Sequence, residues 1–156
     1  MKRIYHVVGI PGVGKSHYIT TQKQENDCVI DLLEYQNDNK SKGLIASEYL
    51  FYADIERKLR DKNNRVIFCE SAHSKSFRRK ALAHYFKTIA NGLDIDAEFH
   101  LVLITATEEK YLANMLSRFP HREMNLEKDL YSKRMEEFEQ PSIDEGWDTI
   151  TVVNYD

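Results

Sequence analysis

The sequence predicts an α/β domain in which helices flank one parallel sheet of five strands. Three observations support this class. Apolar segments alternate with amphipathic segments along the chain, a glycine-rich loop follows the first apolar segment, and the third apolar segment is continuously apolar. Alternating strands and helices favour parallel strands joined by right-handed crossovers, and a continuously apolar strand is typical of a sheet covered on both faces. The length of 156 residues fits a single domain spanning 1–156.

The first half of the chain is expected to form, in order, a strand at 3–8, a helix at 16–24, a strand at 28–30, a helix at 44–61 and a strand at 65–70. Apolar, partly β-branched residues support the strands. The helix at 44–61 carries one stripe that is polar only at Glu48: Leu44, Glu48, Phe51, Ile55 and Leu59. A polar loop is expected at 37–43.

The second half is expected to form a helix at 76–91, a strand at 99–105, helices at 107–119 and 125–139, and a strand at 149–153. The helix at 76–91 is expected to bury Phe77, Ala81, Leu82, Tyr85, Phe86 and Ile89. Thr107 is a good N-cap for the next helix, which ends before Pro120. Asn125 is expected to cap the last helix.

Residues 9–16 match the pattern Gly-x-x-x-x-Gly-Lys-Ser/Thr without a gap. The matching residues are Gly9, Ile10, Pro11, Gly12, Val13, Gly14, Lys15 and Ser16. Such glycines let the backbone wrap around a polyphosphate and turn successive N–H groups inward. We expect Lys15 to contact the β- and γ-phosphates, Ser16 to ligate Mg²⁺ and His17 to line the same site. The motif predicts binding of a nucleoside triphosphate with Mg²⁺.

Carboxylates follow two of the expected strands. Ligands of parallel sheets bind beyond the carboxyl ends of the strands, where Asp31, Glu70 and the glycine-rich loop meet. Glu70 is expected to contact Mg²⁺ through water or to organise an acceptor site, unless it is simply exposed. Asp31 is the expected general base for an acceptor hydroxyl, with Glu34 in reserve. Capping of a helix is the alternative role for Asp31.

Two groups of cations are candidates for substrate contacts. Arg118 and Arg122 flank the break between two helices, as in a lid that brings an arginine onto the transferring phosphoryl group. A basic run opens the helix at 76–91 and is expected to hold a polynucleotide backbone: Lys75, Arg78, Arg79 and Lys80. In both cases a solvated surface is the alternative.

The composition limits which nucleic-acid contacts, membrane segments and cysteine or histidine sites the chain can contain. The net charge of −3 means that any nucleic-acid contact must come from a local basic patch. The longest apolar runs, such as 101–104, are too short for a membrane span. Cys28 and Cys69 show no metal-ligand spacing, which favours buried, reduced thiols in a cytoplasmic protein. No catalytic or metal-binding role is expected for any histidine.

With these residues assigned, the chain resembles the small P-loop kinases typified by the phage RNA-repair polynucleotide 5′-hydroxyl kinase. The stretch 66–71 followed by Arg78-Arg79 is similar to that family's strand, acid and paired-arginine helix. Arg118 occupies the position of the family's transition-state arginine, and residues 138–150 resemble its closing segment. The resemblance implies a P-loop NTPase domain with a helical lid that uses ATP and Mg²⁺.

The resemblance is weaker on the acceptor side. The family's general base lies in an Asp-Asp-Tyr-Arg run, whereas residues 31–36 here read Asp-Leu-Leu-Glu-Tyr-Gln. Direct alignment puts Leu33 at the base position and Gln36 at the arginine, so Asp31 would have to act as the base. Residue 70 is Glu where the family usually has Asp.

The sequence therefore predicts a kinase that transfers the γ-phosphate of ATP to a hydroxyl, above all the 5′-OH of RNA or DNA. Lys15, Asp31 and Arg118 are the expected catalytic residues. The expected substrate-binding residues are Glu34, Glu70, Arg78, Arg79 and Arg122. A small-molecule kinase acting on a nucleoside, sugar or other metabolite, and a nucleotide-binding regulator without catalysis, stay open as alternatives. The choices of RNA or DNA, ATP or GTP, and the number of subunits also stay open.

Overall fold

The computed structural model describes residues 1–38 and 43–156, and this part of the chain contains one sheet of five parallel strands. The strands are β1 (Lys2–Val8), β2 (Cys28–Asp31), β3 (Val66–Ser71), β4 (Ala97–Ala106) and β5 (Thr149–Tyr155). Their order is β2-β3-β1-β4-β5, and every neighbouring pair is parallel. The predicted α/β class with a parallel sheet is confirmed, and β1 leads into the glycine-rich loop from the centre of the sheet.

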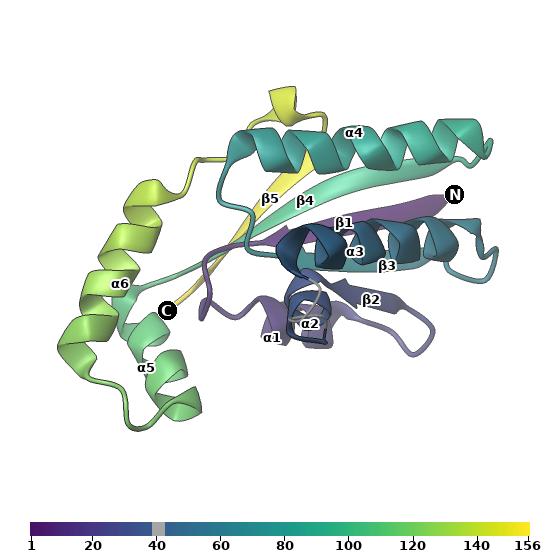
Figure 1. The fold of residues 1–156 in the computed structure, drawn as a ribbon. Coiled ribbons are helices and arrows are strands. Elements are labelled where there is room, and N and C mark those ends of the chain that lie inside the picture. The colour runs from purple at the N-terminus through teal and green to yellow at the C-terminus, as the bar shows by residue number, and fades with distance from the viewer. Residues whose placement is uncertain (39–42) are drawn as a thin grey trace.

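The helices are α1 (Lys15–Gln22), α2 (Leu32–Asp38), α3 (Gly43–Arg60), α4 (Ser76–Gly92), α5 (Glu108–Arg118) and α6 (Met124–Glu137), with a 3₁₀ turn η2 (Ile143–Glu145). Figure 1 shows α3 and α4 running alongside each other on the sheet, whereas α5 and α6 stand together at one end of it. This pair corresponds to the predicted helical lid. Across the described ranges, no helix is both long and apolar enough to cross a lipid bilayer.

The core lies between the central strands and the helices on either side. The strand residues Ile4, Val7, Val8, Leu101, Val102, Leu103 and Ile104 are all buried, without alternation, as expected for strands covered on both faces. From α3, Phe51, Ile55 and Leu59 are completely buried, which confirms that part of the predicted stripe. The side chain of Leu44, also predicted on this stripe, lies outside the described residues.

Helix α2 is a feature that the sequence does not predict. Asp31 Oδ1 accepts a hydrogen bond from the Leu33 N–H at 2.9 Å, so the residue that ends β2 also caps the next helix. Leu32 is buried against the core. The expected polar loop at 37–43 is only partly covered, because residues 39–42 lie outside the described part of the chain.

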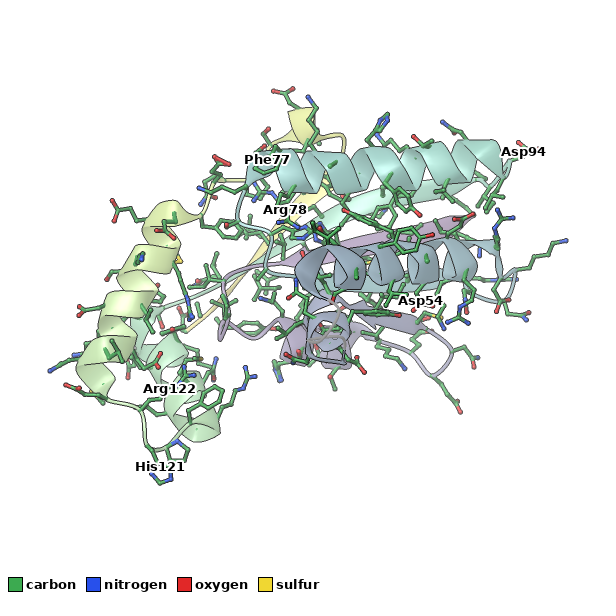
Figure 2. All side chains as sticks on the ribbon, in the orientation of Figure 1. Asp54, Phe77, Arg78, Asp94, His121 and Arg122 are labelled. Carbon is green, nitrogen blue, oxygen red and sulfur yellow. The ribbon has the colours of Figure 1, made fainter. Side chains whose placement is uncertain are left out.

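Helix α4 buries Leu82 and Phe86 as predicted and packs Tyr85 and Ile89 against the core, but two other predicted core residues lie on its surface. Phe77 is 71% exposed (Figure 2), and Ala81 is exposed as well. The face that packs inward instead consists of Arg79, Leu82, Ala83, Phe86 and Ala90. Polar contacts of Arg79, described below, turn the helix in this way. The prediction that Phe77 and Ala81 are core residues is therefore wrong.

Of the two predicted caps of the lid helices, the structure confirms one. Thr107 caps α5 as predicted, since its side chain accepts a hydrogen bond from the Lys110 N–H at 3.2 Å. The N-cap of helix α6 is Glu123, two residues before the expected cap, and no side chain caps this helix. Asn125 therefore does not cap this helix.

Candidate active site at the carboxyl edge of the sheet

Close packing fixes the glycine-rich loop at two of its glycines. A Cβ at Gly9 would lie 2.4 Å from the Ile104 carbonyl oxygen, and one at Gly12 would lie 2.7 Å from Met115 Sδ on the lid helix. Gly12 and Gly14 also have φ angles of +89° and +107°, which side chains rarely adopt. The loop therefore needs glycine for both its conformation and its contacts.

Lys15 lies at the centre of this loop. Its Nζ donates hydrogen bonds to the carbonyl oxygens of Gly9 at 2.7 Å and Ile10 at 3.3 Å. Burial lowers the pKa of Lys15 to about 8, the carboxylates of Glu70 and Asp31 oppose this shift, and the cations Arg118 and Arg134 add to it. The charged groups that act on this amine are of the kinds that a phosphoryl-transfer site uses.

Ser16 and Glu70 meet beside the loop. Ser16 Oγ donates to the Glu70 carboxylate, at 2.9 Å from Oε1 and 3.2 Å from Oε2. Glu70 pairs in register with Asp31 across β3 and β2. Burial and the Asp31 carboxylate raise the pKa of Glu70, while the Ser16 hydrogen bond and Lys15 oppose the increase.

This arrangement fits a magnesium ion. A hydroxyl beside two carboxylates provides the hard oxygen ligands that Mg²⁺ prefers, and Mg²⁺ usually keeps several waters and binds substrate phosphates. Within the described residues no three His, Cys, Asp or Glu side chains form a metal cluster. Ser16 would hold the ion directly and Glu70 through water, with phosphate oxygens completing the shell.

The structure separates the two candidate bases. Asp31 lies at the sheet edge close enough to Lys15 and Glu70 to influence their pKa values, and it also caps α2. Glu34 lies in the first turn of α2 and is exposed. The geometry thus favours Asp31 over Glu34, although both alternatives for Asp31, base and cap, use the same carboxylate.

The lid contacts the loop directly and carries Arg118 at the end of α5. Asn114 Nδ2 donates to the Gly12 carbonyl oxygen at 2.9 Å, which ties α5 to the loop. Arg118 is exposed, and its guanidinium lies 5.6 Å from the centre of the Phe119 ring. Its positive charge also contributes to lowering the pKa of Lys15.

A second lid arginine, Arg134, was not identified from the sequence. Its Nη1 donates to the Tyr111 hydroxyl at 2.9 Å, and its charge also lowers the pKa of Lys15. Helix α6 is polar on most of its surface, so no pattern distinguishes Arg134 from its charged neighbours. Only the packing of α6 against α5 does so.

Arg122 holds the lid together instead of reaching the site. Its Nη1 donates to the buried Glu127 carboxylate at 3.1 Å, and its guanidinium lies 4.0 Å from the centre of the Phe119 ring. Tyr111 donates to the other oxygen of Glu127 at 3.2 Å. Figure 2 shows Arg122 beside the turn that joins the lid helices. Its contacts do not support the predicted role in substrate binding.

The prediction that Arg79 binds substrate is wrong. It is completely buried, and its Nε and Nη2 both donate to the Glu145 carboxylate at 2.9 Å. It also donates to the carbonyl oxygens of His73 at 2.9 Å and Glu139 at 2.7 Å. Its guanidinium thus anchors α4 to η2 and cannot bind a nucleic-acid phosphate. Arg78 remains partly exposed and pairs with Glu48.

His17 and Tyr155 border the loop on the side of β5. Their rings are 5.6 Å apart in an edge-on arrangement, and a Cβ at Gly14 would lie 3.3 Å from the Tyr155 ring. His17 thus lies beside the loop, as predicted. Tyr155 is also a neighbour of the loop, and the sequence analysis did not identify it because it lies far from the loop along the chain.

Comparisons with known proteins agree with this architecture. No family model and no curated protein matches the chain. A fungal RNA kinase is similar with a TM-score of 0.61 and 19% identity, over 98% of this chain and 75% of that one. A tunicamycin resistance protein from Deinococcus radiodurans has a TM-score of 0.61 and 12% identity, over 97% and 86%. A gluconokinase from Sinorhizobium meliloti 1021 has a TM-score of 0.53 and 16% identity, over 98% and 82%. The chain has the fold of the P-loop kinases.

Proposed function

We propose that this protein is an ATP-dependent kinase whose acceptor is the 5′-hydroxyl of RNA or DNA. The observation that carries the kinase proposal is the convergence at one sheet edge of Lys15, the Ser16–Glu70 pair and Asp31, beneath a lid that carries Arg118. Phosphoryl transfer depends mainly on positioning and on electrostatic stabilisation, and these groups supply both.

Each group has a distinct task in the proposed reaction. The acceptor oxygen attacks the γ-phosphorus, the bond to the ADP oxygen breaks, and the hydroxyl proton passes to the Asp31 carboxylate. Lys15 neutralises the β- and γ-phosphates, and Arg118 contacts the equatorial oxygens on which charge accumulates. The magnesium ion held at Ser16 would supply further charge neutralisation.

Two observations support a polynucleotide acceptor. One of the similar structures is a fungal RNA kinase. In addition, Lys75, Arg78 and Lys80 lie at the amino-terminal end of α4, where Lys75 and Lys80 are exposed and Arg78 is partly exposed. Such cations suit a phosphodiester backbone.

The burial of Arg79 favours a second candidate function, a kinase for a small metabolite. With this arginine committed to Glu145, the basic surface at α4 is smaller than the sequence suggests. A gluconokinase is also among the similar structures. The same catalytic groups would serve a sugar or nucleoside hydroxyl equally well.

An acceptor screen with γ-labelled ATP separates these proposals. The panel contains 5′-OH and 5′-phosphate forms of one RNA and one DNA oligonucleotide, together with nucleosides and sugars, and Lys15→Ala serves as the inactive control. Labelling of 5′-OH ends alone supports the polynucleotide kinase. Labelling of a metabolite alone favours the second candidate, and ATP binding without any labelled acceptor would contradict both.

A further inference from the structure

Three polar side chains form a cluster between α3, α4 and the loop after β3, and we call it the Glu48 cluster: Glu48, His73 and Arg78. Arg78 Nη2 donates to Glu48 Oε1, and His73 Nε2 lies 3.7 Å from the same oxygen. Arg78 is 41% exposed and Glu48 26%, whereas His73 is only 6% exposed. Figure 2 shows Arg78 between the amino-terminal ends of α3 and α4.

His73 is the unusual member of this cluster. Neither of its ring nitrogens forms a hydrogen bond with any described group, whereas buried polar atoms are nearly always paired. Burial and the charges of Arg78 and Arg79 lower its pKa to about 4, so the ring is neutral at pH 7 and one nitrogen carries a proton. A small movement would bring that N–H into hydrogen-bonding distance of Glu48.

The cluster adjoins the candidate active site. His73 follows Glu70 by three residues at the end of β3, and Ser71, between them, lies 2.6 Å from the buried His6 ring through its Oγ. The charge of Lys15 contributes to lowering the pKa of His6. Arg78 is connected to the loop that leaves this edge of the sheet, because His73 lies on that loop and both side chains face the same Glu48 carboxylate.

We propose that the Glu48 cluster binds the phosphodiester next to the acceptor hydroxyl through an exchange of hydrogen-bond partners. Arg78 turns from Glu48 to the phosphate, and the His73 N–H takes its place on Glu48. This inference rests on the proposed polynucleotide kinase function. It names the group that is recognised: the phosphate linking the first and second nucleotides of a strand with a 5′-hydroxyl.

The exchange explains why an arginine and a spare donor are placed together. A guanidinium matches phosphate geometry with two parallel hydrogen bonds. If Arg78 left alone, Glu48 would remain a partly buried carboxylate without a partner, which is costly. His73 removes that penalty by donating to Glu48 in place of Arg78. Its ring nitrogens are unpaired before the phosphate binds, so one of them is available for this hydrogen bond. His73 is thus a positioning residue that acts through Glu48.

Calorimetric titration without ATP tests this inference directly. The probes are uridine and uridylyl-(3′→5′)-uridine, which share a 5′-hydroxyl and differ in the phosphodiester. Arg78→Ala is expected to remove about tenfold or more of the advantage of the dinucleotide. Glu48→Gln should instead strengthen dinucleotide binding several-fold, because it frees Arg78. Glu56→Gln, with the same charge change on the same helix but paired with Arg60 at 2.7 Å, should have no effect.

A second set of variants tests His73. His73→Ala should weaken dinucleotide binding in the wild-type background and have no effect in the Glu48→Gln background, while His73→Gln, which keeps an N–H donor, should restore it. Thermal melting verifies that each variant is folded. Equal losses in both backgrounds would show that His73 only supports the fold and would overturn the exchange.

Parallel transfer assays separate this inference from the function on which it rests. Transfer to the dinucleotide that is unaffected by Arg78→Ala and Glu48→Gln would overturn the cluster and leave the kinase proposal intact. Dinucleotide binding that depends on Arg78, without any transfer, would support the cluster and overturn the proposed kinase.

Discussion

The nucleotide side and the acceptor side of the site are built in different ways. On the nucleotide side, eight consecutive residues form the loop, and its glycines are fixed by backbone conformation and close packing. On the proposed acceptor side, β2, α3, α4 and the end of β3 contribute one or two side chains each. The difference shows that a site made from contiguous backbone is visible in sequence, whereas a site assembled from side chains depends on how helices are turned.

The arginines show the same contrast. Five arginines lie on α4, on the lid helices or on the turn between the lid helices: Arg78, Arg79, Arg118, Arg122 and Arg134. Arg79 and Arg122 have committed their guanidinium groups to the carboxylates of Glu145 and Glu127, which are both nearly or completely buried. The other three have weaker partners: Arg78 pairs with the partly exposed Glu48, Arg118 lies over the Phe119 ring, and Arg134 donates to the Tyr111 hydroxyl. Buried carboxylate partners, 66 residues away for Arg79 and five residues away for Arg122, decide which arginines are structural.

Replacing Arg79 is expected to produce the largest effect. Arg79→Ala would leave Glu145 buried without its partner and should lower the free energy of unfolding by about 3–5 kcal/mol, measured by urea denaturation. Arg78→Ala on the same helix removes a partly exposed pair and should cost less than about 1 kcal/mol. Similar losses in both variants would contradict the distinction between a structural and an available arginine.

The pH dependence of this stability has a defined sign. Although burial opposes it, hydrogen bonds from Arg79, Ser76 and Trp147 hold the pKa of Glu145 below its usual value. A lowered carboxyl pKa contributes stability above the unfolded-state pKa, and this stability is lost as pH falls through the folded-state value. The Arg79→Ala variant should therefore lose less stability than the wild type between pH 5 and 3.

Asp31 is expected to matter next, and only on the acceptor side. Asp31→Asn keeps the size of the side chain but removes the base, so transfer should fall by about 10²–10⁴-fold while the Kd for ATP stays unchanged. The matched control is Glu34→Gln, which should have little effect on either quantity. A greater loss in the control would move the base to Glu34.

The two lid arginines should separate in steady-state kinetics. Arg118→Ala should lower kcat by about 10²-fold with a small change in the KM for ATP, because its contact is made when charge spreads over the phosphoryl group. Arg122→Ala should act mainly on stability, since it leaves the buried Glu127 without its cation. If Arg122→Ala produces the greater kcat loss in a protein of normal stability, the assignment is reversed.

The smallest effect concerns the pH dependence of ATP binding. The pKa of Lys15 is lowered to about 8, so the ammonium is lost at lower pH than in an exposed lysine, and the Kd for ATP should increase as pH rises through 8, by at most about tenfold per unit. Lys15→Arg should flatten this profile, because arginine stays charged. Arg118→Ala should move the midpoint of this pH profile upward, because the charge of Arg118 lowers the pKa of Lys15. An unchanged midpoint would exclude electrostatic coupling between Arg118 and Lys15.

Much of the fold followed from local patterns. The five strands, the parallel sheet and the break at Pro120 were predicted because apolar runs and chain-breaking residues act over a few positions. Helix α2 was missed, although capping of a helix was the alternative role for Asp31, because its seven residues are too few to show a clear helical period. The prediction that Phe77 is a core residue of α4 was wrong. Phe77 is more apolar than Arg79, so periodicity alone ranks Phe77 as the buried residue.

The sequence by itself determined the nucleotide loop and the parallel arrangement of strands that brings Asp31 and Glu70 to the same edge, because both depend on backbone geometry and short-range patterns. The tertiary structure decided which charged side chains are free. Glu145 lies 66 residues from Arg79 along the chain, and Glu48 lies 30 residues from Arg78. Such pairs form only when the folding of the chain brings a carboxylate and a cation together, and no local pattern in the sequence shows which pairs will form.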